Sequence, residues 1–132
     1  MIPRDCVLRI ARPTDNLRRI AQMYCDGLGF ELLGDFEDHL GFYGVMIGHP
    51  QHHYHLEFTH HQGTKVGRAP TQDNLLVFYM PDAQRWQTQC EQMRAAGFID
   101  VASYNPYWDN TGKTFEDTDG YRVVLAQRGW TA

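Results

Sequence analysis

The stretch PTDNLRRIAQMYCDGLGF, residues 13–30, has a counterpart in PDAQRWQTQCEQMRAAGF, residues 81–98, and this pair decides the fold. Both begin with proline, carry apolar residues at helical spacing and end in glycine and phenylalanine. They lie 68 residues apart at either end. The spacing predicts an amphipathic helix in each stretch. We expect Thr14 or Asp15 to cap the first helix, and Gly27 and Gly29 to end it.

Strand-like runs surround the predicted helices in the same order in both halves. The last runs also align, because YHLEF at 54–58 and YRVVL at 121–125 lie 67 residues apart. An internal repeat of strand, helix and three further strands predicts two βαβββ units and an α+β fold class. The predicted strands are VLRIARP (7–13), FELLGDF (30–36), GFYGVMIG (41–48), HHYHLEFTH (52–60) and LLVFYMP (75–81). Three later runs are predicted to be strands or hairpin arms: IDVASYNPYW (99–108), GKTFED (112–117) and GYRVVLAQR (120–128).

The length predicts a single domain over residues 1–132. Within it we expect a first repeat at about 6–61, a polar linker or mobile loop at 62–73 and a second repeat at about 74–129. The formal charge of −4 and the isoelectric point near 5.9 argue against a nucleic-acid partner. No apolar run approaches the roughly 20 residues of a membrane span, and the start of the chain lacks the features of a signal peptide. A cytoplasmic location without membrane partners is therefore expected.

Three segments resemble the vicinal oxygen chelate superfamily, which contains glyoxalase I, bleomycin-resistance proteins and extradiol dioxygenases. They are MYCDGLGFELL (23–33), HLEFTH (55–60) and FEDTDGYRVVL (115–125). The chain is most similar to the small single-domain members of unassigned function. The resemblance implies that the two units curl into one mixed-sheet cup with the helices outside. It also implies pairing as a homodimer.

Metal enzymes of this superfamily place one ligand on the first strand and one on the last strand of each unit. Carried over to this sequence, those positions fall on Glu57, on Arg9 or Leu8, on Leu75 or Val77, and on Val124. Arginine stays protonated, and leucine and valine offer no ligand atom. Because one position of four keeps a ligand, no metal cofactor is predicted. The alternative is a divalent ion on Glu57 and His55.

The histidine-rich stretch HHYHLEFTHH, residues 52–61, reads as a strand with two faces. Alternation puts His55 and Glu57 on one face and Leu56 and Phe58 on the other. We expect the apolar pair to pack on a helix, so that Glu57 looks into the cup. Three ligands on one strand would span about 13 Å, too far for a single ion. The favoured interpretation is a carboxylate hydrogen-bonded to a histidine or an arginine.

Arg9, on the first predicted strand, affects which role Glu57 can have. If both face inward, they form an ion pair on the floor of the cup, or Arg9 holds a substrate carboxylate. A salt bridge without function is the alternative. The segment SYNPYWDN (103–110) suits an organic ligand at the mouth of the cup, or else a structural hairpin. The candidate substrate-binding residues are Arg9, Arg12, His55, Tyr79, Asn105, Tyr107, Trp108 and Asp109.

Three functional hypotheses follow. The first is a metal-independent protein that holds a small organic molecule in a polar, aromatic-lined cup, either sequestering it or transferring a proton with Glu57 as the catalytic base. The second is a divalent-metal lyase, isomerase or dioxygenase that uses Glu57 with His55 or with a histidine of a partner chain. The third is a non-enzymatic protein that acts through its dimer surface.

Overall fold

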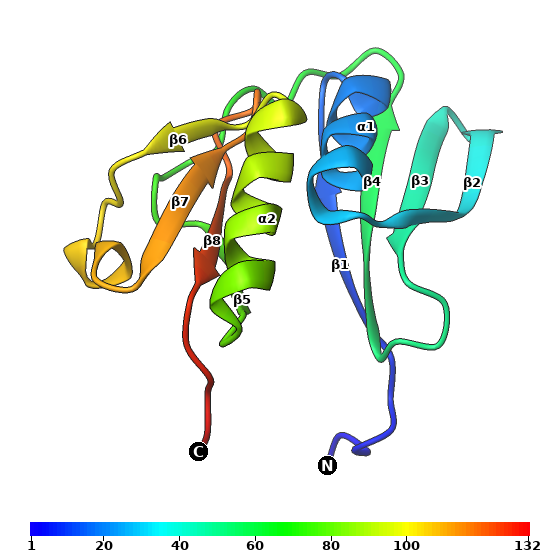
Figure 1. The fold of residues 1–132 in the computed structure, drawn as a ribbon. Helices are drawn as coiled ribbons and strands as arrows, with labels where there is room; N and C mark the ends of the chain where they lie inside the picture. The colour runs from blue at the N-terminus through cyan, green and yellow to red at the C-terminus, as the bar shows by residue number, and fades with distance from the viewer. The chain divides into compact units, whose positions relative to one another are not determined.

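Each repeat forms a four-stranded mixed sheet with one α-helix in the computed structural model, which describes residues 1–132 (Figure 1). The α+β class with two βαβββ repeats is confirmed. Residues 1–25 and 29–67 form one compact unit, and residues 26–28 and 68–132 form the other. Neither helix is long and apolar enough to cross a membrane.

The first sheet has the strand order β1-β4-β3-β2, with β1 parallel to β4 and the other pairs antiparallel. The helix of this repeat lies between β1 and β2 in sequence, so that β1 and β4 become parallel neighbours at one side of the sheet. The elements are β1 (Leu8–Pro13), α1 (Leu17–Leu28), β2 (Glu31–His39), β3 (Phe42–Gly48) and β4 (Tyr54–His61).

Helix α1 buries one face and ends at Leu28, so Gly29 follows the helix as predicted but Gly27 lies inside it. Its face carries Ile20 and Tyr24, both fully buried, and Gly29 ends it in the left-handed conformation at φ 71°. The predicted caps are wrong, because Asn16 is the N-cap residue and makes no side-chain capping bond. The side chains of Thr14 and Asp15 accept backbone N–H groups outside the helix instead.

The second sheet repeats the layout in the order β5-β8-β7-β6. Asp82 caps α2 by accepting the backbone N–H of Arg85 at 2.8 Å, and Cys90 and Met93 are buried on its inner face. The elements are β5 (Leu75–Tyr79), α2 (Ala83–Ala95), β6 (Ile99–Val101), the 3₁₀-helix η1 (Pro106–Asp109), β7 (Gly112–Glu116) and β8 (Arg122–Ala126).

The predicted strand at 99–108 is only partly correct. Three residues pair with β7 as β6, and the remainder turns into η1. The side chain of Asn105 accepts the N–H of Tyr107 at 3.1 Å, and Pro106 begins the helix with its fixed φ. This local cap and the proline end the strand early.

Candidate functional site

The two faces of the first sheet are set by the register of β4. The rings of Tyr24 in α1 and Phe58 in β4 lie 4.9 Å apart, so Phe58 marks the face covered by the helix. Glu57 therefore belongs to the opposite face, as the alternation predicted. We call this opposite surface the helix-free face of the first sheet. On it His55 stands beside Arg9 of β1, and Glu57 stands beside Met46 of β3.

Arg9 joins Glu57 and His55 on the helix-free face. Its Nη1 donates to Glu57 Oε2 at 3.4 Å, and its Nε donates to His55 Nε2 at 2.9 Å. The Glu57 side chain is 11% exposed and that of Arg9 is 49% exposed. The predicted ion pair of Arg9 with Glu57 is thus present, with the carboxylate inside and the guanidinium at the surface.

Arg9 is only partly engaged by its two partners. In its contact with His55, the imidazole Nε2 accepts the Arg9 Nε–H. The Nη2 group of Arg9 makes no hydrogen bond to the protein and keeps its N–H groups for another acceptor. A half-exposed guanidinium, oriented by two buried or half-buried partners, is suited to hold a carboxylate, phosphonate or carbonyl oxygen.

The metal that the superfamily implies does not fit these residues. A divalent ion bound to Glu57 and His55 would have to displace the permanently positive Arg9 from both. Within either unit, no three His, Cys, Asp or Glu side chains gather in a way that could hold a metal ion. The donor set is that of a carboxylate and an imidazole arranged around an arginine.

The second sheet has no carboxylate at the position that corresponds to Glu57. Val124 occupies it, opposite Val77 and Thr114, and is 0% exposed. Two residues earlier on the same face, Arg122 donates to Glu116 Oε1 at 3.2 Å and to the carbonyl of Ala102 at 3.2 Å. This second arginine is only 6% exposed, so it is part of the packing of the sheet.

Arg12 and Tyr79 are two further candidate residues. Arg12 is on the helix-covered face, where its Nη1 donates to the hydroxyl of Tyr24 at 3.4 Å. Tyr79 is an exposed residue at the end of β5, beside Ala126 of the second sheet. The structure therefore brings together Arg9, His55 and Glu57 but does not add Arg12 to their face.

Several polar groups of the segment around η1 form hydrogen bonds that stabilise the segment itself. The Asp109 carboxylate accepts the backbone N–H of Ser103 at 3.2 and 3.3 Å. The hydroxyl of Tyr107 accepts Arg128 Nη1 at 2.7 Å, and its ring lies 5.0 Å from that of Trp108. With Asn105 capping η1, these contacts match the structural hairpin that the sequence left open as an alternative.

Sequence reasoning missed a cavity of about 600 Å³ between α1 and the strands β2 and β3. It opens on the helix-covered face of the first sheet, away from Glu57. Asp35 and Glu37 of β2 are among its lining residues. The alternation of these acids with apolar residues in ELLGDFED (31–38) was a signal, but only the strand register shows that they stand beside an uncovered apolar floor.

Known structures share this fold. The fosfomycin resistance protein FosX of Mesorhizobium loti matches with a TM-score of 0.72 at 10% identity, over 98% of this chain and 94% of that chain. TnmS3, an antibiotic binding protein from Streptomyces sp. CB03234, matches with a TM-score of 0.67 at 18% identity, over 98% and 100% of the two chains. The chain thus shares its fold with these two proteins.

The family of the chain follows from matches of higher identity. Residues 8–59 match the YycE-like N-terminal domain and residues 73–127 match the YycE-like C-terminal domain. The uncharacterized protein YycE of Bacillus subtilis (strain 168) is 44% identical over 118 residues, covering 89% of this chain and 85% of that protein. The chain belongs to the YycE-like family.

A crystal structure of the Bacillus subtilis YycE protein supports the same assignment. It matches with a TM-score of 0.88 at 41% identity, over 97% of this chain and 93% of that chain. That protein is described as having an unknown function, with glyoxalase or fosfomycin resistance protein as the suggested class.

Proposed function

We propose that the chain binds a small organic molecule with an anionic or carbonyl oxygen on the helix-free face of the first sheet, without a metal ion. The observation that carries the proposal is the position of Arg9, which contacts both Glu57 and His55 and has an uncommitted Nη2. In this proposal the guanidinium polarises the ligand oxygen, which is the task that a metal performs in other members of the superfamily.

Charge and burial support this assignment. Glu57 is nearly buried, so its charge depends on Arg9 for compensation, and the pair orients the guanidinium. His55 accepts the Nε–H and fixes the plane of the guanidinium from the other side. An arginine held at two of its nitrogens loses little side-chain freedom when a ligand binds to the third. The site is therefore preorganised for a planar or tetrahedral oxyanion.

Binding without catalysis is the simpler form of the proposal. The named relatives FosX and TnmS3 are a fosfomycin resistance protein and an antibiotic binding protein, and both names concern small organic molecules. A proton transfer by Glu57 would require the ligand to reach the carboxylate past Arg9. We also propose that the protein forms a homodimer and has a cytoplasmic location.

The test combines metal analysis with ligand-dependent melting of protein purified without a histidine tag. The compounds are fosfomycin and a series of short carboxylic acids, measured against Arg9→Met and a matched control. Arg19→Met is the control, because Arg19 is an exposed arginine outside this face. We expect no stoichiometric metal and a melting shift for at least one acid that is lost in Arg9→Met and kept in Arg19→Met.

Two results would overturn the proposal. Stoichiometric zinc, nickel, iron or manganese that disappears in Glu57→Ala would establish the metal-dependent alternative with Glu57 and His55 as ligands. A melting shift that survives Arg9→Met would place the ligand elsewhere.

A further inference from the structure

The cavity on the helix-covered face exists because one helix cannot cover four strands. An α-helix with its side chains is about 10–12 Å wide, whereas four strands at about 4.8 Å spacing present a wider surface. Figure 1 shows α1 in front of β1 and β4, with β3 and β2 extending beyond it. The contacts of Tyr24 with Arg12 and Phe58 tie the helix to these two strands. The outer strands form an uncovered floor.

The floor of the cavity is apolar and its size suits a small molecule. Its volume of about 600 Å³ lies within the range of about 300–1,000 Å³ found for ligand sites. The apolar lining residues come from the helix and from both outer strands. They include Leu17, Ala21, Leu32, Val45 and Ile47.

The charged lining is mostly acidic. Three carboxylates, Asp15, Asp35 and Glu37, accompany one arginine, Arg18, so these four side chains sum to a charge of −2. Asp15 is already engaged, because its two oxygens each accept a backbone N–H at 2.9 Å. Asp35 and Glu37 are exposed and form no salt bridge.

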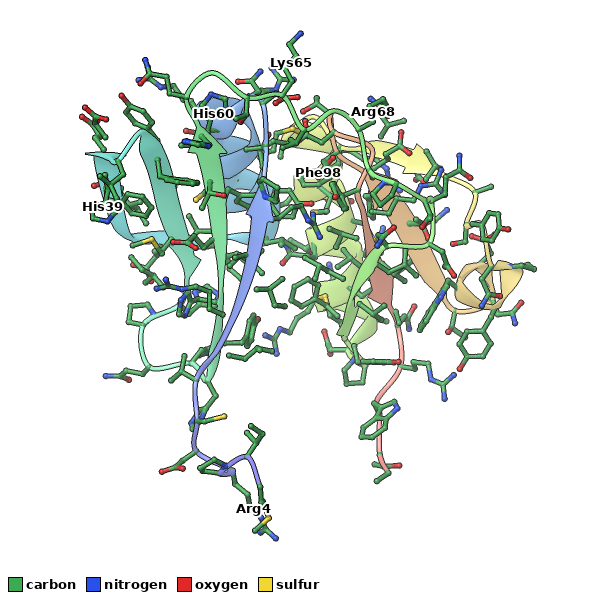
Figure 2. The ribbon with its side chains drawn as sticks, turned by 180° about the vertical axis from the view of Figure 1, so that it is seen from behind. Arg4, His39, His60, Lys65, Arg68 and Phe98 are labelled. Carbon is green, nitrogen blue, oxygen red and sulfur yellow. The ribbon has the colours of Figure 1, made fainter.

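The two sides of the cavity differ in charge. The α1 side carries Arg18 and the positive start of the helix beside Asp15, whose oxygens already accept backbone N–H groups, whereas the β2 side carries Asp35 and Glu37. His60 also lines the cavity, and Figure 2 shows it near the end of β4 with the loop that carries Lys65 beyond it. A cationic ligand group is therefore expected beside Asp35 and Glu37 on β2.

We propose that this cavity is a second binding site, for an organic cation with an apolar body, such as an aliphatic amine. The apolar body lies on the Val45 and Ile47 floor, where its burial removes hydrocarbon from water. The ammonium group pairs with Asp35 and Glu37, and the ring of Tyr43 offers it a further attractive surface. This site uses none of the Arg9 group, so it stands independently of the proposed function.

The test compares three probes with the same hydrocarbon chain: nonylamine, nonan-1-ol and nonanoate. Affinity is measured by titration calorimetry, and the location is followed by backbone amide shifts. We expect nonylamine to bind most tightly and to shift residues of α1, β2 and β3. The double variant Asp35→Asn/Glu37→Gln should weaken nonylamine about fivefold, as expected for partly exposed charge pairs. It should leave nonan-1-ol unchanged.

Two further variants separate this site from other sources of binding. Val45→Trp fills the floor and should abolish binding of all three probes, with circular dichroism as the check of folding. Arg9→Met should leave nonylamine binding unchanged. Loss of nonylamine binding in Arg9→Met would overturn this proposal and leave the Arg9 site standing. Equal affinity for amine, alcohol and carboxylate would also overturn it.

A second copy of the chain is the other possible occupant of an uncovered apolar floor. In that case Val45→Trp would change the oligomeric state in analytical ultracentrifugation, and nonylamine would bind more weakly as protein concentration rises. Either observation would overturn the ligand proposal and assign the floor to a subunit interface.

Discussion

Both sheets carry an arginine–glutamate pair on the face away from their helix, but the two pairs use different strands. In the first sheet, Arg9 of β1 meets Glu57 of β4 at 3.4 Å. In the second, Arg122 of β8 meets Glu116 of β7 at 3.2 Å. Leu75 stands beside Arg122 just as Arg9 stands beside His55. The charge pair therefore joins the first and last strands in the first repeat, but the last two strands in the second repeat.

The difference in exposure separates a pair that can serve a ligand from one that serves the fold. The Arg9 side chain is half exposed, whereas that of Arg122 is almost completely buried and also bonds the carbonyl of Ala102. An exposed pair contributes little stability, while breaking a buried one leaves an uncompensated charge. The first repeat can thus direct its arginine to another molecule, and the second cannot.

Exchanging the residues at positions 57 and 124 gives the largest expected effect. Val124→Glu places a carboxylate at a site with 0% exposure and should lower the free energy of unfolding by about 3–4 kcal/mol. Glu57→Val makes the reverse change in the first sheet and should cost less than about 1 kcal/mol, because water can solvate Arg9. Urea denaturation of both variants checks this. Similar costs at the two positions would show that the repeats do not differ as described.

Removing the arginine from each pair sharpens the same comparison at a smaller scale. Arg122→Met should lower the free energy of unfolding by about 2–3 kcal/mol, because Glu116 and the Ala102 carbonyl lose their donor. Glu116 keeps Arg68 at 3.8 Å, which limits the loss. Arg9→Met leaves the nearly buried Glu57 carboxylate without its cation and should cost about 1–2 kcal/mol, less than Arg122→Met, because Arg9 itself is half exposed. Chemical denaturation provides both values, and a larger cost for Arg9→Met would mean that the first pair is structural too.

Most of the fold could be predicted because its signals are local. The spacing of apolar residues and glycines such as Gly29 predicts the paired helices, the order of the strands and the two faces of β4. The errors arise where a side chain bonds a distant or neighbouring backbone group. Asp15 holds Val66 and Gly67 and is therefore not a helix cap. Asn105 begins η1 where a longer strand was expected.

The part of the candidate site that could be predicted is the part set by the alternation of side chains along a strand. The meeting of Arg9 with Glu57 needs only alternation and the pairing of the first strand with the last. Arg12 is three residues after Arg9, so alternation puts it on the other face, where it contacts Tyr24 of α1. The cavity beside Asp35 depends on how much of the sheet α1 covers, and that is a property of packing.

The smallest expected effect concerns the aspartates that precede the two helices. Asp82 caps α2, whereas Asp15 binds the backbone of the 66–67 loop. These backbone N–H groups of Val66 and Gly67 lower the pKa of Asp15 below its usual value. A carboxyl whose pKa is lowered by folding contributes stability above its unfolded pKa of about 4, and loses this contribution as pH falls through the folded pKa. We therefore expect Asp15→Asn to melt below the wild type at pH 6.

The pH dependence distinguishes this contact from a general loss of charge. The difference in melting temperature between wild type and Asp15→Asn should shrink as the pH falls from about 4 to about 2, because the wild-type carboxyl then becomes neutral as well. Asp5→Asn changes an exposed aspartate near the start of the chain and serves as the control, with no such pH-dependent difference expected. A constant difference in melting temperature at all pH values would contradict this prediction, because the contribution of Asp15 would then not depend on its negative charge.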